Sequence, residues 1–139
     1  QVSIDAQEYS HIEQGLLVLL GITHDDTASD AEWLVQKILK MRIFDDEAGV
    51  MNRSVMDIQG DVMVVSQFTL TAATQKGNRP SYIRAERPEH AKPLYQYFVE
   101  NLSQDLQRPV ATGQFGADMQ VSLLNDGPVI ILMDTHNKE

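Results

Sequence analysis

Two continuous apolar runs constrain the fold of this chain more than any other feature of its sequence. The first is GLLVLLGIT, which begins at Gly15, and the second is DVMVVSQFTL, which begins at Asp61 and turns polar at Ser66 and Gln67. Neither run alternates apolar with polar residues, and each is bounded by glycine or polar residues. This pattern is typical of strands that are buried on both faces. Neither run is long enough to span a bilayer.

Two helices are predicted between these and other strands. The segment SDAEWLVQKILKMRIF begins with Ser29, and Glu32 three residues later completes a capping box. Its apolar residues recur at helical spacing and predict a core-facing stripe of Ala31, Leu34, Val35, Ile38 and Met41. The second helix is expected from roughly Pro88 to Leu102, with Leu94, Phe98 and Leu102 on one face. Pro88 suits a helix start, whereas Pro93 belongs in the first turns.

Further strands are expected toward the two ends of the chain, in VSI at Val2, in ADMQVSLL and in VIILM. Strands at both ends with two helices between them predict a single α/β domain over residues 1–139 with mixed sheets, not an alternating parallel fold. A chain of 139 residues is also a normal size for one domain.

Composition limits the classes of function. The chain has no cysteine, which excludes disulfides, thiol nucleophiles and thiolate metal sites and suits a reducing, cytoplasmic location. Its four histidines have no metal-ligand spacing, so we expect neither a metal nor another cofactor. A net charge of −9 argues against coating long nucleic acid such as DNA. Five of the eleven Lys and Arg residues nevertheless lie between Lys76 and Lys92, either on a solvated loop or as a patch for a few phosphates.

Two short segments carry the candidate chemistry. SQFTL, from Ser66 to Leu70, places hydroxyls and an amide where a strand ends, either to meet a ligand or to satisfy nearby backbone groups. In LLNDGPVIIL, Asn-Asp-Gly predicts a hairpin turn, but Pro128 has no N–H to give to the second strand. Judged from these residues alone, a turn with trans Pro128 at a strand edge is the favoured interpretation.

The order of the motifs resembles that of D-aminoacyl-tRNA deacylases over nearly the whole chain. The matching segments are GLLVLLGI, RIFDDEAGVMN, VVSQFTL, GNRPSY, LYQYFV and TGQFGADMQVSLLNDGPV. The resemblance implies a compact, barrel-like α/β homodimer that hydrolyses the ester of D-aminoacyl-tRNA, with a cis Gly127–Pro128 peptide projected into the partner's active site. An N-terminal strand with a Gln-Arg pair, usual in the family ahead of Val2, is missing, and Ile130 stands where the family has threonine.

The resemblance also implies roles for residues. We expect the turn at Ser66, Gln67 and Phe68 to supply backbone N–H donors to the substrate carbonyl, with Thr69 beside it and the ribose 2′-OH placing water. The Gly127–Pro128 backbone would exclude L-amino acids by collision, so that diverse D-amino acids, and glycine mischarged on tRNA-Ala, are released. The remaining expected contacts are Phe115, Met119 and Asn125 for the aminoacyl-adenosine moiety and Lys76, Arg79 and Arg84 for phosphates.

Two other functions are also compatible with these residues. One is a non-catalytic module that binds RNA or a nucleotide through the same pocket. The other is an esterase of small substrates that uses Ser66 or Thr69 as a nucleophile, although no activating base is visible near either residue in the sequence.

Overall fold

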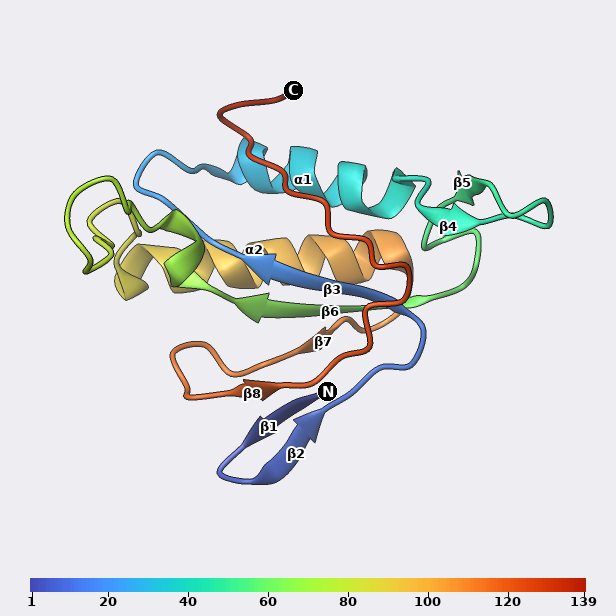
Figure 1. Ribbon diagram of the computed structural model, residues 1–139, viewed down its shortest axis with the longest axis horizontal. Coiled ribbons are helices and arrows are strands. Elements are labelled where there is room, and N and C mark those ends of the chain that lie inside the picture. The colour runs from blue at the N-terminus through green and yellow to red at the C-terminus, as the bar shows by residue number, and fades with distance from the viewer.

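The computed structural model describes residues 1–139 as a layered α/β domain (Figure 1). Its helices are α1 (Ala28–Lys40), the short 3-10 helix η1 (Phe68–Thr71) and α2 (Pro88–Leu106). Its strands, in chain order, are β1 (Val2–Ile4), β2 (Gln7–Ser10), β3 (Gly15–Leu20), β4 (Phe44–Asp45), β5 (Met51–Arg53), β6 (Asp61–Ser66), β7 (Ala111–Thr112) and β8 (Gln120–Val121).

The central layer is a parallel sheet in the order β3-β6-β7. Strand β6 is buried on both faces, as predicted, because Val62 and Val64 enter one hydrophobic cluster and Met63 and Val65 enter another. Strand β3 differs from the prediction. It lies at the edge of the sheet, and only Leu20 is fully buried in it, since no strand covers its outer side in the single chain.

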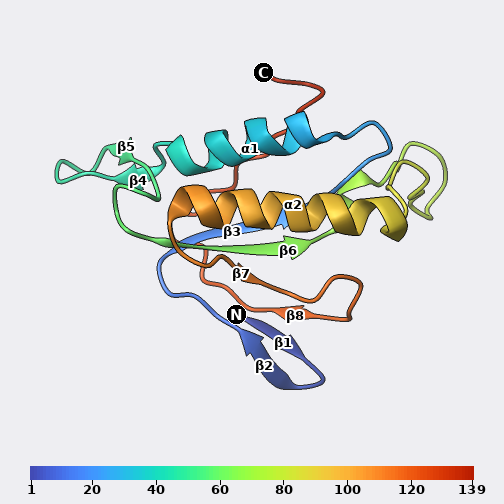
Figure 2. The same cartoon turned by 180° about the vertical axis from the view of Figure 1, so that it is seen from behind.

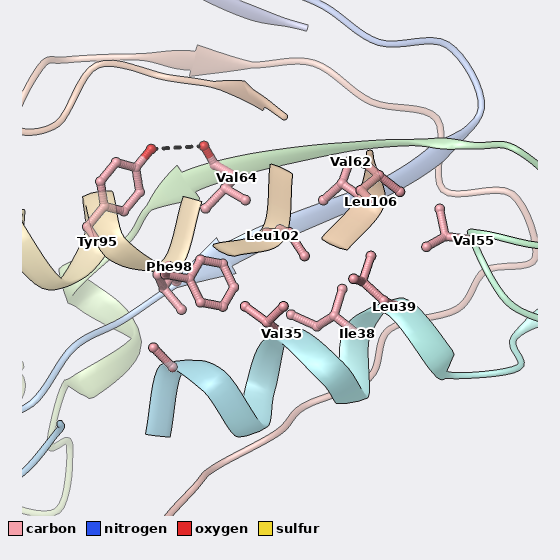
Figure 3. Close-up of a cluster of buried hydrophobic side chains, with 12 residues drawn as sticks. Val35, Ile38, Leu39, Val55, Val62, Val64, Tyr95, Phe98, Leu102 and Leu106 are labelled. Atoms are coloured by element: carbon pink, nitrogen blue, oxygen red, sulfur yellow. Dashed lines mark hydrogen bonds between the residues drawn. The ribbon is translucent and has the colours of Figure 1, made fainter. Parts of the chain in front are cut away.

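The two helices cover one side of this sheet, and the antiparallel sheet β2-β1-β8 covers the other side (Figures 1 and 2). Figure 3 shows the helix-facing core, in which α1 contributes Val35, Ile38 and Leu39. Helix α2 meets them with its own buried stripe of Tyr95, Phe98, Leu102 and Leu106. On the opposite side, Val2 of β1 packs fully buried against β6.

The helix ends depart from the prediction. Helix α1 begins at Ala28 with Thr27 as its N-cap, and the capping box pairs Thr27 with Asp30, not Ser29 with Glu32. Both pairs have the same spacing, and the earlier pair prevails because the Thr27 N–H donates to the Asp30 carboxylate at 2.8 Å. Helix α2 starts at Pro88 as expected but runs through Pro93 to Leu106, since burial of its apolar stripe outweighs one missing hydrogen bond.

The C-terminal strands are shorter than predicted. Strand β8 contains only Gln120 and Val121, the VIILM segment forms no strand, and the strands make three separate sheets instead of a closed barrel. Pro128 lacks the N–H that a second hairpin strand would use. The segment after β8 therefore leaves large apolar side chains exposed, among them Leu123, Leu124, Ile130 and Leu132. Neither long helix combines the length and hydrophobicity needed to cross a membrane.

Candidate functional site

The candidate site lies at the carboxyl edge of the parallel sheet. Because β3, β6 and β7 run in the same direction, the segments that follow them emerge at one edge. These segments are Gly21 after β3, η1 after β6 and the chain toward Phe115 after β7. Ligands of open α/β sheets characteristically bind at this edge. The tertiary structure therefore brings the predicted SQFTL and Phe115 segments to the same side of the molecule.

Helix η1 is anchored directly on β3. The N–H of Gln67 donates to the carbonyl of Leu20 at 2.8 Å. Gly21 allows the close approach, because a Cβ atom built on it would lie 3.2 Å from both the Gln67 carbonyl oxygen and the Cβ of Leu70. A side chain at position 21 would thus push η1 away from the sheet.

Two adjacent backbone N–H groups are free at the start of η1. Phe68 and Thr69 are its first residues, so their N–H groups have no carbonyl partner within the helix. The carbonyls of the same two peptide units are occupied: the Gln67 oxygen accepts from the Leu70 N–H at 3.2 Å, and the Phe68 oxygen accepts from the Thr71 hydroxyl at 2.8 Å. Both peptide planes are therefore fixed with their N–H groups directed away from the turn. Paired backbone donors of this kind bind anions and developing oxyanions.

The hydroxyl groups of the site have no activating base. The amide Nε2 of Gln67 donates a short hydrogen bond to Thr69 Oγ1, and the Ser66 hydroxyl makes no side-chain hydrogen bond. Neither hydroxyl contacts a histidine or a carboxylate. A nucleophile–base pair, which activated serine and threonine enzymes require, is absent from this geometry.

A loop between η1 and α2 packs against the site. Phe68 and Tyr82 form an edge-to-face pair with ring centroids 5.1 Å apart, although both rings remain largely exposed. Lys76 and Arg79 extend from the loop into solvent and form no hydrogen bond or ion pair within the chain. Arg84, predicted together with them as a phosphate contact, donates from Nε and Nη2 to the Thr71 carbonyl at 3.3 and 3.2 Å.

The end of this loop that precedes α2 forms hydrogen bonds with His24. Its ring nitrogens lie 2.8 Å from the Ile83 carbonyl oxygen and 3.1 Å from Glu86 Oε1. The hydrogen bond to Ile83 and the carboxylate of Glu86 together raise the pKa of His24 above its usual value. Sequence spacing could not reveal this contact, since 62 positions separate His24 from Glu86.

Phe115 and Met119 occupy different environments. The half-buried ring of Phe115 packs against Tyr95 with centroids 5.6 Å apart, near the end of β6, where the Tyr95 hydroxyl donates to the Val64 carbonyl. Met119 packs against the cluster of Val2, Met63 and Val65. Its sulfur lies so close to Gly113 that a Cβ atom there would stand 2.4 Å away. In the single chain Met119 therefore serves as a packing residue.

The Gly127–Pro128 peptide bond is cis, as the resemblance implied. Asn125, predicted to bind substrate, closes this turn because its Oδ1 accepts from the Val129 N–H at 2.9 Å. Gly127 has φ +144°, and a Cβ atom on it would lie 2.8 Å from the Val129 side chain. The chain just after β8 passes at the end of the sheet opposite the green helical turn that follows β6 (Figures 1 and 2). Within one chain, the segment that leaves β8 therefore starts at the end of the sheet away from η1.

Two further features were not anticipated from the sequence. A surface pocket of about 320 Å³ lies between the amino ends of α1 and α2 and includes none of the predicted site residues. A cluster of possible cation ligands lies nearby. Its ligand atoms, from Asp26, Asp30 and His136, lie within 4.8 Å of one another. His136 pairs with Asp26 at 2.7 Å, and Lys138 lies over the Trp33 ring, so these contacts fasten the C-terminal segment to α1.

Comparison with known proteins matches this chain to one family over nearly its whole length. The family model described as D-Tyr-tRNA(Tyr) deacylase matches residues 1–134. The D-aminoacyl-tRNA deacylases of Parabacteroides distasonis and Porphyromonas gingivalis are 59% and 60% identical over 138 residues, which cover 99% of this chain and 92% of each relative.

Solved structures show the same fold. The c-Myc DNA Unwinding Element Binding Protein superposes with a TM-score of 0.87 at 42% identity, covering 92% of this chain and 87% of that one. A probable eukaryotic D-amino acid tRNA deacylase superposes with a TM-score of 0.72 at 16% identity, covering 86% of this chain and 84% of that one, a likeness of fold. On the strength of the full-length sequence matches, the chain belongs to the D-Tyr-tRNA(Tyr) deacylase family.

Proposed function

We propose that this protein hydrolyses the ester bond of D-aminoacyl-tRNA and releases the free D-amino acid and tRNA. The observation that carries the proposal is the pair of free N–H groups of Phe68 and Thr69 at the carboxyl edge of the sheet, in a chain of this family. An aminoacyl ester is already a reactive acyl group. It needs a positioned carbonyl, a water molecule and donors for the oxyanion, and the two N–H groups meet the last need.

The missing side-chain base fits the same chemistry. Because neither Ser66 nor Thr69 contacts a histidine or carboxylate, we infer that water attacks the ester directly. The 2′-OH of the terminal ribose, adjacent to the ester, positions that water. The substrate hydroxyl and the backbone amides then share the catalytic work.

The loop beyond η1 supplies the contacts to RNA. Lys76 and Arg79 are exposed and unpaired, so their charges are available to phosphates near the 3′ end of the tRNA. Two or three phosphate contacts suit a protein whose net charge is −9, since the overall charge opposes binding along extended nucleic acid. The Phe68–Tyr82 pair joins this loop to η1, the helix that begins with the oxyanion donors.

We infer further that the working enzyme is a homodimer. Leu124, Ile130 and Leu132 are 90%, 85% and 85% exposed, an apolar surface that a second copy would cover. The same association would carry the Gly127–Pro128 backbone to the partner's η1. There it would collide with an L side chain at the substrate α-carbon, whereas a D side chain would point away and glycine would present nothing to collide. This filter predicts broad acceptance of D-amino acids and hydrolysis of glycyl-tRNA.

The decisive experiment compares three substrates on the same tRNA: D-tyrosyl, L-tyrosyl and glycyl esters. We expect hydrolysis of the D and glycyl esters and protection of the L ester. Equal rates on the D and L esters would refute the chiral filter. Tight binding of D-tyrosyl-tRNA without hydrolysis would favour a non-catalytic RNA-binding module instead, and covalent labelling by a phosphonate inhibitor would favour a serine or threonine esterase.

The dimer has its own test. Replacing Leu124 by glutamate places a charge in the proposed interface, and we expect light scattering to show a monomer that has lost deacylation. Val50→Glu is the matched control, because Val50 is also exposed but lies in the β4–β5 turn and not in the segment that follows β8. A monomeric wild-type protein with full activity would contradict the dimer.

A further inference from the structure

We propose that Thr71 and Arg84 are positioning residues for deacylation, and that they act by fixing the peptide unit that carries the Thr69 N–H. This inference rests on the proposed function, because it assigns a role to the donors of the oxyanion. It gives Arg84 a different role from that of the neighbouring cations Lys76 and Arg79, which face solvent.

The first contact that fixes this peptide unit is made by the hydroxyl of Thr71. This side chain belongs to a residue that is only 6% exposed, so its hydroxyl needs a partner inside the protein. It donates to the Phe68 carbonyl oxygen at 2.8 Å. That oxygen and the Thr69 N–H belong to one planar peptide unit and point in opposite directions. Holding the oxygen therefore aims the N–H outward, toward the substrate.

The second step is the guanidinium of Arg84. Its Nε and Nη2 atoms both donate to the carbonyl oxygen of Thr71, at 3.3 and 3.2 Å. This carbonyl ends η1 and has no partner within that helix. Two donors from one planar guanidinium restrain the Thr71 carbonyl, and with it the backbone of Thr71, more firmly than a single donor would. The backbone pairing of Ala73 with Ser81, in which both N–H groups donate at 2.8 and 2.9 Å, holds the loop that presents Arg84.

The two contacts are connected through Thr71, which accepts one hydrogen bond with its carbonyl and donates another with its hydroxyl. They run from the Arg84 guanidinium to the Thr71 carbonyl, and from the Thr71 hydroxyl to the Phe68 carbonyl. The other candidate donor, the Phe68 N–H, lies on a peptide unit whose Gln67 carbonyl accepts from the Leu70 N–H, and neither Thr71 nor Arg84 donates to that unit. Loss of either Thr71 or Arg84 contacts should hence loosen one of the two donors while leaving the substrate-binding surface in place.

Thr71→Val tests the first step, because valine keeps the shape of threonine and lacks the hydroxyl. We expect kcat on D-tyrosyl-tRNA to fall about tenfold or more, in line with the loss from misplacing one oxyanion donor, while KM changes less than about twofold. Thr71→Ser restores the hydroxyl and should recover most of the wild-type kcat. A purely structural role for the methyl group would give the reverse order, with Val active and Ser impaired.

Arg84→Gln tests the second step, with Lys76→Gln as its matched control. We expect the Arg84 variant to lose kcat and to keep the wild-type dependence of kcat/KM on salt. The Lys76 variant should keep kcat, raise KM and lower the salt slope by about 0.7 to 0.9, the amount for one phosphate contact. Arg84 is exposed, so its variant should fold, and it carries the test if Thr71→Val unfolds below the assay temperature.

Three results would overturn the inference: wild-type kcat in both Thr71→Val and Arg84→Gln, no recovery of kcat by serine, or a reduced salt slope with a raised KM in Arg84→Gln. The last result would identify Arg84 as a phosphate ligand. An inactive wild-type enzyme is a separate outcome, because it would refute the proposed deacylation itself and not only the positioning role of Thr71 and Arg84.

Discussion

Replacing Thr69 by alanine separates backbone catalysis from a side-chain nucleophile. The Thr69 hydroxyl has one partner, the exposed amide of Gln67, and an amide is no base. Alanine therefore removes one neutral hydrogen bond at the surface, worth about 1 kcal/mol, and leaves the backbone N–H of residue 69 in place. That free energy corresponds to a loss of about fivefold in rate. Removal of a true nucleophile would instead cost about a millionfold, as in serine proteases.

The assay is single-turnover hydrolysis of D-tyrosyl-tRNA, quenched in acid and followed by loss of precipitable label. We expect Thr69→Ala to remain within about tenfold of wild type, or about 1.4 kcal/mol. Thr69→Ser is the matched control, because it would preserve a nucleophile and should also stay close to wild type. A drop of more than about a thousandfold in the alanine variant, with serine active and both variants folded, would show that the hydroxyl attacks the ester and would refute the backbone mechanism.

Three other predictions follow from the geometry. Changing both Lys76 and Arg79 to glutamine should raise KM and lower the salt slope of kcat/KM by about 1.4 to 1.8, and an unaltered slope would contradict their contact with phosphates. Tyr95→Phe should lower the free energy of unfolding in urea by about 1 kcal/mol at neutral pH, since it removes a hydrogen bond to a β6 carbonyl. Burial raises the pKa of Tyr95 from 10.0 to about 12. The contribution of Tyr95 to the free energy of unfolding is therefore complete below pH 10.0 and is lost as the pH rises through about 12. The phenylalanine variant should not show this loss. NMR titration should give His24 a pKa above 6.5, and this pKa should fall in Glu86→Gln. The contact of His24 with Glu86 should stabilise the fold fully below pH 6.5 and weaken as the pH rises through the raised pKa. A His24 pKa that does not change in Glu86→Gln would contradict the pairing.

Sequence reasoning recovered the elements whose apolar pattern is strong. The run in β6 predicted burial on both faces, and Val64 and Val65 indeed enter different clusters. The same pattern failed for β3, because periodicity reports which side chains prefer burial and not which neighbours are present to cover them. The VIILM segment failed for the same reason. Its residues have strand propensity, yet no adjacent strand pairs with them in the single chain.

Some features of the candidate site could be predicted from the sequence, and others could not. Motif order alone indicated the family and the SQFTL and NDGPV segments, since a local turn needs particular residues at fixed spacing. The role of Arg84 was beyond such reasoning. A basic residue in a polar loop looks like a phosphate contact, and only the path of the loop reveals that its guanidinium reaches the carbonyl of Thr71, 13 positions earlier.

By itself the sequence determined the elements with a strong apolar pattern, such as β6 and the two long helices, and the family that the chain resembles, because these follow from the order and spacing of residues along the chain. Only the tertiary structure decided that β3, β6 and β7 end at one edge, that the N–H groups of Phe68 and Thr69 stay free, and that the chain leaves β8 at the opposite end of the sheet. The physical reason is that hydrogen bonds between distant residues depend on how the layers pack, and packing is a property of the whole folded chain.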